Sequence, residues 1–234
     1  NSNCIYKEWK KVNPGEIIVF NKNCEKKLFY DFKKKINKDI SKNLNFRKNN
    51  LENKFDEILN KVIEDILVAD VNVGVFLSGG VDSSLVTCYA KQYDNNLNTF
   101  SVGIKNNQDY DESSQAEKIS KHLKTKHETF FVDNEEIIEN LENAILSYDE
   151  PFADSSKILT YILSKKVKKK IKVALTGDGA DELFGGYNRH ILAFYIGRVS
   201  KLFGKDILNN NFFKKSSTIF FPLMKILMSQ FYAY

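Results

Sequence analysis

Cysteine is scarce in this sequence, with only Cys4, Cys24 and Cys88 among its 234 residues. Their number is odd and no two form a Cys-x-x-Cys pair, which argues against a disulfide framework and against a structural zinc site. We therefore expect the chain to work in a reducing compartment. Histidine is equally scarce, and because its three residues lack metal-ligand spacing we expect all of them at the surface: His122, His127 and His190.

Long apolar runs and a targeting segment are also missing. No stretch of 18 apolar residues occurs, and the N-terminus does not resemble a signal peptide. We expect no membrane partner and a cytoplasmic location. The sequence begins at Asn1 rather than at a methionine, so we expect a piece of a longer protein.

The composition is that of a globular protein. Hydrophobic residues make up 42% of the chain, and the length allows one large domain or one domain plus part of a second. The formal net charge is +5. That excess would help to bind ATP or another polyanion, but it does not distinguish between them.

Hydrophobic periodicity predicts a helix over residues 51–68, with one apolar stripe that covers a sheet. Beyond it, strands alternate with helices, which indicates an α/β fold with a parallel sheet, right-handed crossovers and helices on both faces. An isolated strand at 16–20 and a linker over 31–50 precede this region. The predicted strands are 73–77, 97–104, 126–132 and 171–175, and the predicted helices are 84–92, 112–123, 135–148 and 156–167.

Residues 78–84 read S-G-G-V-D-S-S and lie between a predicted buried strand and a predicted helix. Glycines let the backbone approach a ligand closely, and a helix N-terminus presents N–H groups to an anion. We interpret this stretch as a phosphate-binding loop rather than a purely structural turn. Asp82 fits beside a phosphate only if it holds Mg²⁺. Gly80 stands where a Walker A motif has its lysine, so the loop belongs to another class.

A second loop follows the predicted strand 171–175 and reads T-G-D-G-A-D-E-L-F-G-G-Y. Asp178, Asp181 and Glu182 place three carboxylates close together, which is costly unless solvent, hydrogen bonds or a cation offset their repulsion. Both loops follow the carboxyl ends of parallel strands, where ligands bind in such sheets. We expect them to face one Mg²⁺–pyrophosphate site; the alternative is a solvated acidic turn that caps the next helix.

The first loop resembles the S-G-G-x-D-S loop of the ATP pyrophosphatase superfamily, which implies an adenine nucleotide alpha-hydrolase-like fold. Five motifs occur in order: L-S-G-G-V-D-S-S, F-S-V-G, Y-D-E-S, D-E-P-F-A-D-S-S and L-T-G-D-G-A-D-E-L-F-G-G-Y. Together they resemble the synthetase domain of glutamine-hydrolysing asparagine synthetases. The resemblance implies that residues 51–234 are a C-terminally incomplete synthetase domain. Residues 1–50 would be a linker and a remnant of the glutaminase domain.

The resemblance also implies which residues bind ATP. The adenosine would contact Leu77, Val102, and the backbone of Thr176 and Gly177. The phosphates would be cradled by residues of the first loop, namely Ser78, Gly79, Gly80, Ser83 and Ser84.

The same resemblance implies the catalytic and metal-binding residues. Asp82 and Asp181 would hold Mg²⁺ and pyrophosphate. Asp178 would orient ammonia and the acyl-adenylate, although many family members have the longer glutamate at this position. Residues 149–151 would either border the substrate pocket or simply end a helix.

The implied reaction is the ATP-dependent amidation of aspartate through β-aspartyl-AMP, with ammonia supplied by glutamine hydrolysis. The implied ligands are ATP, Mg²⁺ and aspartate, with no nucleic acid, and a homodimer is a possible assembly. The family's N-terminal glutaminase cysteine and its catalytic lysine after the G-G-Y motif have no counterpart in this sequence.

Three other functions remain compatible with the sequence. An RNA-modifying adenylating enzyme would use the basic run 165–170, although such a run is usually a solvated helix end. A relative that amidates a sugar carboxylate would share the same adenylation chemistry. A nucleotide-binding module without turnover would explain the missing residues.

Overall fold

The structure is a computed structural model that describes residues 3–20, 25–31, 34–38, 48–105, 111–150, 154 and 156–203. The chain divides into two compact units, residues 1–177 and residues 178–234. We describe each unit by itself.

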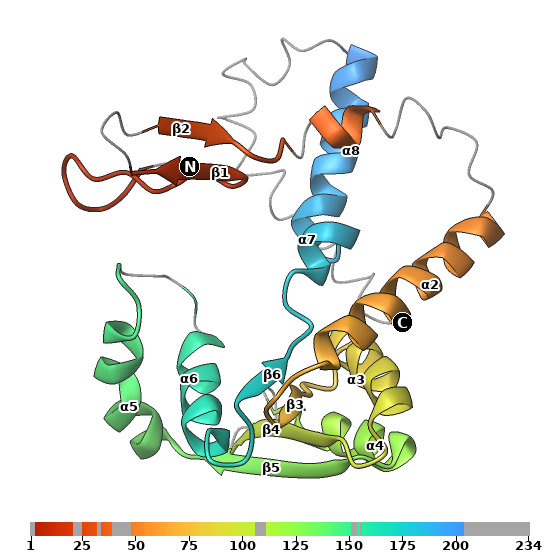
Figure 1. Ribbon diagram of the computed structural model, residues 1–234, viewed down its shortest axis with the longest axis vertical. Coiled ribbons are helices and arrows are strands. Elements are labelled where there is room, and N and C mark those ends of the chain that lie inside the picture. Colours follow the sequence, from red (N-terminus) through yellow and green to blue (C-terminus); the bar gives the residue numbers. More distant parts are fainter. Residues whose placement is uncertain are drawn as a thin grey trace. The chain divides into compact units, whose positions relative to one another are not determined.

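The first unit contains a four-stranded, wholly parallel sheet (Figure 1). Its strands are β3 (Val73–Phe76), β4 (Asn98–Ile104), β5 (Lys126–Val132) and β6 (Val173–Leu175), in the order β5-β4-β3-β6. The predicted α/β fold with a parallel sheet is thereby confirmed, and each strand lies within about two residues of its predicted bounds.

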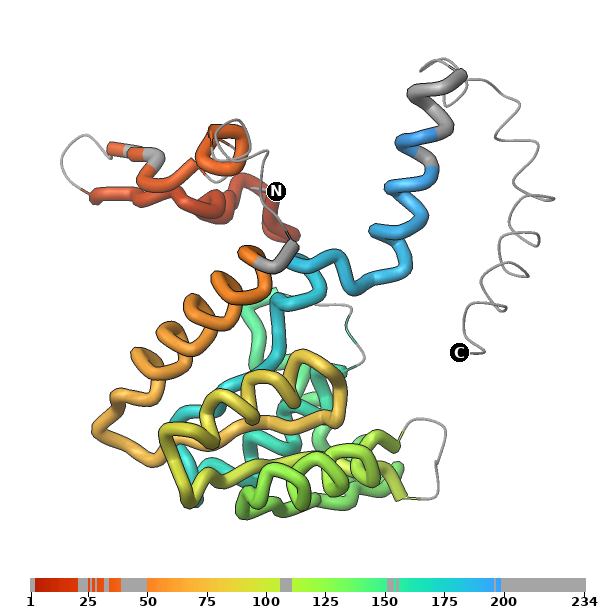
Figure 2. The backbone as a smooth tube through the Cα atoms, turned by 90° about the vertical axis from the view of Figure 1, so that its right-hand side faces the viewer, coloured from red at the N-terminus to blue at the C-terminus, as the bar shows by residue number. Residues whose placement is uncertain are grey.

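Helices cover both faces of this sheet, as the alternating pattern predicts. On one face, α2 (Lys48–Leu67) and α3 (Val81–Tyr93) close a core around Val75 and Leu175. On the same face, α4 (Ser113–Leu123) lies beside α3 (Figure 2). On the other face, α6 (Ser156–Val167) packs over Phe100, with α5 (Asn134–Leu146) next to it.

The chain order explains why the two groups of helices lie on opposite faces. From β3 the chain moves to β4 and then to β5 through α3 and α4 on one face. To return to β6, on the far side of β3, a right-handed crossover must use the other face. The order therefore reverses between β3 and β6. In open parallel sheets this reversal point is where ligands bind.

Two helices expose more apolar surface than their patterns predict. Helix α2 buries Ile63 and joins α3 through a hydrogen bond from the Tyr89 hydroxyl to Asp56, which raises the pKa of Tyr89 to about 12. Its residues Leu51, Ile58 and Val62 are instead exposed, so the predicted stripe faces the core only in part. Helix α5 likewise turns buried Asn140 and Ala144 inward, whereas Ile138, Leu141 and Ile145 are exposed.

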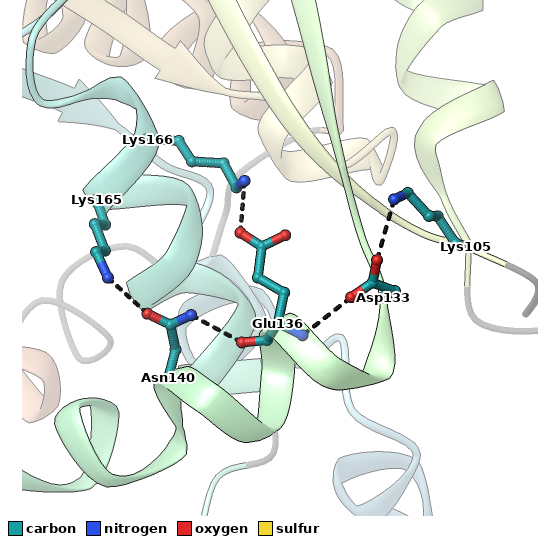
Figure 3. A network of polar contacts seen from close by, with 6 residues as sticks. All are labelled: Lys105, Asp133, Glu136, Asn140, Lys165 and Lys166. Carbon is teal, nitrogen blue, oxygen red and sulfur yellow. Dashed lines mark hydrogen bonds and ion pairs between the residues drawn. The ribbon is translucent and has the colours of Figure 1, made fainter.

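The basic run at the end of α6 is largely engaged within the protein (Figure 3). Lys165 donates to the Asn140 side chain at 2.9 Å, and Lys166 pairs with Glu136 at 2.6 Å. Lys170 pairs with Glu128 on β5. Lys165 and Lys166 connect α6 to α5, whereas Lys168 and Lys169 are exposed. The engaged lysines reduce the cationic surface that the RNA-binding alternative would use.

The N-terminal segment forms a two-stranded antiparallel sheet of β1 (Glu16–Val19) and β2 (Glu25–Leu28). Strand β1 matches the predicted strand, whereas β2 was not expected. Residues 34–38 are helical within the predicted linker.

The second unit contains two consecutive helices, α7 (Ala180–Phe184) and α8 (Asn188–Phe203). Among the described helices, none is both long and apolar enough to cross a membrane.

A polar layer lies between α4 and the sheet, and it corrects the expectation that His127 is a surface residue. Its imidazole contacts three hydroxyls: Nδ1 lies 2.9 Å from Thr99 Oγ1, and Nε2 lies 3.2 Å from both Ser101 Oγ and Thr129 Oγ1. Thr99 and Ser101 are themselves buried. Burial lowers the pKa of His127, and the nearby Glu117 carboxylate opposes this only in part.

This burial predicts that acid destabilises the fold through His127. Because its pKa is lowered in the folded state, the unfolded chain binds more protons below its ordinary pKa of about 6.5, and stability falls as the pH drops through that value. Urea unfolding between about pH 7.5 and about pH 5.5 should show a smaller loss of stability in His127→Gln than in the wild type. The control is His122→Gln, since His122 is exposed on α4; an equal pH dependence in all three proteins would contradict the prediction.

Candidate active site

The phosphate-binding loop predicted over residues 78–84 connects β3 to α3 and is braced by its own serines. Ser83 Oγ, which is buried, accepts hydrogen bonds from Ser78 N at 3.2 Å and lies 2.9 Å from Ser78 Oγ. It donates to the Gly80 carbonyl at 3.3 Å, and Ser84 Oγ donates to the same carbonyl at 2.6 Å. Ser83 and Ser84 therefore hold the loop in shape, beyond their predicted role as phosphate donors.

Helix α3 begins without a side-chain cap, which makes its N-terminus available to an anion. The helix starts at Val81, with Gly80 as the N-cap residue, and the first helical hydrogen bond runs from Ser84 N to the Gly80 carbonyl at 3.1 Å. Helix geometry leaves the preceding N–H groups of Val81, Asp82 and Ser83 without intrahelical acceptors. These groups and the positive end of the helix dipole form an anion-binding position at the reversal point of the sheet.

Gly177 brings the second predicted loop against the first. It follows β6, which pairs with β3 so that Leu175 is opposite Val75. A Cβ atom at Gly177 would lie 2.7 Å from the Ser83 nitrogen and 2.9 Å from the Asp82 Cβ. Only glycine allows this approach. The start of the second motif therefore lies against the phosphate-binding loop. This meeting was expected, because both loops follow the carboxyl ends of parallel strands.

Asp82 occupies the second position of α3, where the helix dipole stabilises a carboxylate. The dipole explains why a carboxylate is tolerated here, but the carboxylate's repulsion of a phosphate still has to be offset by a cation. In the part of the chain that the structure describes, its carboxylate forms no ion pair. Its oxygens are the ligand type that Mg²⁺ prefers, and Mg²⁺ commonly binds one or two carboxylates together with substrate phosphates.

The residues predicted to contact adenosine lie at the same edge of the sheet. Leu77 follows β3, is buried, and donates its backbone N–H to the Phe100 carbonyl at 2.8 Å. Val102 lies near the end of β4 and is half-buried beside the core on the α6 face. Thr176 and Gly177 are half-buried after β6. Their position fits the prediction, while the contact with a nucleotide remains a prediction.

The second unit carries the rest of the acidic motif on the short helix α7. Gly179 and Gly185 flank this helix with φ angles of +89° and +75°, which only glycine adopts readily. Tyr187 donates to Glu182 at 2.7 Å, which lowers the pKa of that carboxyl. Asp181 has no ion-pair partner among the described residues, so its carboxylate oxygens also suit Mg²⁺.

Within the described residues, no three His, Cys, Asp or Glu side chains converge on a metal position. Asp178 is exposed at the start of the second unit, and its predicted catalytic role is not tested by this geometry. Asp181 and Glu182 lie in the first turn of α7, but the N-cap residue is Gly179 and the helix has no side-chain capping hydrogen bond, so the prediction that these two carboxylates cap the helix is wrong.

Residues 149 and 150 follow the end of α5, and Glu150 contacts the N-terminal segment. The helix closes at Leu146, and the Glu150 carboxylate then accepts a hydrogen bond from the Ile5 backbone N–H at 3.4 Å and pairs with Lys11. The helix thus ends two residues before its predicted bound at residue 148. Pro151 lies outside the described residues, and a border with the substrate pocket remains a prediction.

Asp111 belongs to the Y-D-E-S motif, but no role was predicted for it from the sequence. Asp111 of Y-D-E-S accepts hydrogen bonds from Ser113 N at 3.0 Å and from Ser113 Oγ at 2.9 Å, at the start of α4. The signal was available, because an aspartate two residues before a serine at a helix start is a common local hydrogen-bonding pattern.

The chain is similar to known asparagine synthetases. The family model of asparagine synthase matches residues 54–216. Asparagine synthetase [glutamine-hydrolyzing] 1 of Bacillus subtilis is 42% identical over 120 residues, which cover 51% of this chain and 19% of that protein. The putative asparagine synthetase [glutamine-hydrolyzing] 2 of Methanocaldococcus jannaschii is 37% identical over 136 residues, covering 57% and 26%.

A solved structure of NH3-dependent NAD synthetase from Campylobacter jejuni, in complex with a nitrate ion, is also similar. It has a TM-score of 0.41 and 19% sequence identity, over 58% of this chain and 60% of that chain. The chain spans about a fifth to a quarter of the length of the two synthetases. Since the family model covers more than half of the 234 residues, the chain belongs to the asparagine synthase family.

Proposed function

We propose that this chain is the ATP-activating part of a glutamine-hydrolysing asparagine synthetase, a ligase that amidates aspartate through β-aspartyl-AMP. The observation that carries the proposal is the uncapped start of α3 at the reversal point of the sheet, with Gly177 against Ser83. It offers a polyphosphate several N–H donors beside a carboxylate. Membership in the asparagine synthase family supports aspartate as the acid that is activated.

In the first step, a β-carboxylate oxygen of aspartate attacks the α-phosphorus of ATP. A new oxygen–phosphorus bond forms, the bond between the α-phosphorus and the bridging oxygen breaks, and pyrophosphate leaves. The N–H groups of Val81, Asp82 and Ser83 would bind phosphate oxygens of ATP and of the leaving pyrophosphate. Because these donors are fixed by the loop before the reaction, they cost no reorganisation when charge develops.

Two carboxylates, one in each unit, offer oxygens of the type that Mg²⁺ prefers. Asp82 and Asp181 would hold Mg²⁺, each through carboxylate oxygens that have no ion-pair partner among the described residues. The bound ion would neutralise charge on the phosphate oxygens. Leu77, Val102 and the Thr176–Gly177 backbone would hold the adenosine, so that the phosphates reach α3 in one orientation.

In the second step, ammonia attacks the acyl carbon, the bond to AMP breaks, and asparagine and AMP are released. Asp178 would orient the ammonia and the acyl-adenylate. We further propose that glutamine hydrolysis in another part of the whole protein supplies the ammonia, and that the protein acts as a cytoplasmic homodimer. Residues 1–50 would then belong to the linker and the glutaminase domain, and residues 51–234 to the synthetase domain.

Exchange of labelled pyrophosphate into ATP tests this proposal without the amidation step. The purified full-length protein should catalyse exchange only when both aspartate and Mg²⁺ are present, because exchange requires reversible formation of the acyl-adenylate. Light scattering on the same sample measures the oligomeric state. Exchange with a sugar acid but not with aspartate would overturn the choice of substrate. No exchange with any carboxylic acid would favour a binding module without turnover.

A further inference from the structure

The first turn of α4 lies directly behind the phosphate-binding loop. Gly79 has a φ angle of +88°, and a Cβ atom there would lie 2.8 Å from the Ala116 nitrogen and 2.9 Å from the Gln115 Cβ. Ala116 is completely buried. Since no space separates the two backbones, the position of Gly79 depends on where α4 begins.

Asp111 fixes that beginning. Glu112, the N-cap residue by position, makes no side-chain capping hydrogen bond. Instead, the two carboxylate oxygens of Asp111 accept hydrogen bonds from the backbone N–H and the hydroxyl of Ser113, at 3.0 and 2.9 Å. Ser113 is buried. Loss of these acceptors would leave buried donors without a partner, which the first turn can avoid only by moving.

The same carboxylate lies over the end of strand β4. A Cβ atom at Gly103, the residue after Val102, would lie 3.2 Å from Asp111 Oδ1 and 2.7 Å from the Phe131 ring. Gly103 therefore makes room both for Asp111 and for Phe131. Through this contact Asp111 connects the carboxyl end of β4 to the start of α4, and through α4 to Gly79.

We infer that Asp111 is a positioning residue of the ATP site, which holds the phosphate-binding loop in register through the first turn of α4. The inference rests on the proposed function in that the loop is taken to bind ATP. Through α4 and Gly79, Asp111 acts on the placement of the phosphates. Its loss should therefore lower kcat of pyrophosphate exchange more than it raises the KM for ATP.

The test compares three variants of the full-length protein. Asp111→Ala should lower kcat of exchange about 10- to 100-fold, since a displacement near 1 Å costs up to about 10²-fold, with the KM for ATP within about threefold of wild type. Asp111→Asn should recover most of the activity, because its amide can still accept from the Ser113 N–H and donate to the Ser113 hydroxyl.

Asp133→Ala is the matched control. Asp133 caps α5 by accepting from Glu136 N at 3.0 Å, and α5 packs on α6 rather than on the loop. Both alanine variants should lower the melting temperature by a few degrees through the lost cap. Only Asp111→Ala should lose exchange, and wild-type kcat in a folded Asp111→Ala protein would overturn the inference.

Amide hydrogen exchange separates this inference from the proposed function. Asp111→Ala should speed exchange of the amides at residues 79–83, whereas Asp133→Ala should not. If the wild type shows no pyrophosphate exchange, the proposed function fails, and the amide measurement still decides whether Asp111 holds the loop. Unchanged amide protection in Asp111→Ala would overturn the inference by itself.

Discussion

Gly177→Ala should reduce pyrophosphate exchange by about 100-fold or more. The new methyl group would lie 2.7 Å from the Ser83 nitrogen and 3.0 Å from the Asp82 carbonyl carbon, closer than such atoms can approach. Either the start of α3 or the end of β6 must move. If neither moved far, the methyl group would still cover the Ser83 N–H that we assign to a phosphate oxygen. Both outcomes harm the site.

The effect of Gly177→Ala on stability should be smaller than its effect on activity. Overpacking costs about 1–3 kcal/mol, which urea unfolding measures directly. Gly197→Ala is the matched control, because no described atom lies within 4 Å of a Cβ at that position in α8. In a helix interior, alanine is favoured over glycine by about 0.5–1 kcal/mol, so this variant should keep both exchange and stability. Full exchange by a folded Gly177→Ala protein would contradict the assigned role of Ser83.

The elements that build the site were predictable because their signals are local. An apolar run followed by S-G-G-V-D-S-S specifies β3, a tight loop and a helix start, and the structure has them at these residues. The alternation of strands and helices likewise indicates the parallel sheet. Both loops follow strand ends, so their meeting near Gly177 could be expected from topology alone. Helix α3 begins at Val81, three residues earlier than predicted, and this places Asp82 on the helix.

The contacts that fix the loop depend on residues far apart in the sequence, and no local pattern reports them. The approach of Gly79 to Ala116 and the interaction of His127 with Thr99 require the strand order and register. A hydrophobic stripe also does not reveal how much of it is covered. Helix α2 is periodic over its whole length, yet Leu51 is about half exposed while Ile63 is buried.

The lysines of α6 show how structure changes the interpretation of charge. Residues 165–170 include five lysines, and the sequence alone therefore suggests a cationic surface. The structure pairs Lys166 with Glu136 and Lys170 with Glu128, on two different elements. Glu136 lies 30 positions before Lys166, and Glu128 lies 42 positions before Lys170. Two of the five lysines therefore pair with acidic residues that the run itself does not reveal.

Asp82→Asn should lower pyrophosphate exchange by about 100- to 1,000-fold, because it removes one carboxylate of the proposed magnesium site in a position where charge develops. The variant should remain folded. The lost interaction between the carboxylate and the α3 dipole is worth only about 0.3–1 kcal/mol. The amide oxygen remains a weaker ligand, so the residual exchange should need more Mg²⁺ for half-maximal rate.

The magnesium dependence makes this result specific to Asp82 and separates it from a general loss of negative charge. Asp65→Asn removes the same charge from an exposed position on α2, where Asp65 pairs with Lys61 at 2.8 Å, and should leave both the rate and the magnesium requirement unchanged. A calorimetric titration of ATP at low and high Mg²⁺ gives a second readout, in which Asp82→Asn should weaken only the magnesium-dependent part of ATP binding. Wild-type exchange and an unchanged magnesium requirement in Asp82→Asn would show that Asp82 does not bind the metal, and its place in α3 would then be purely structural.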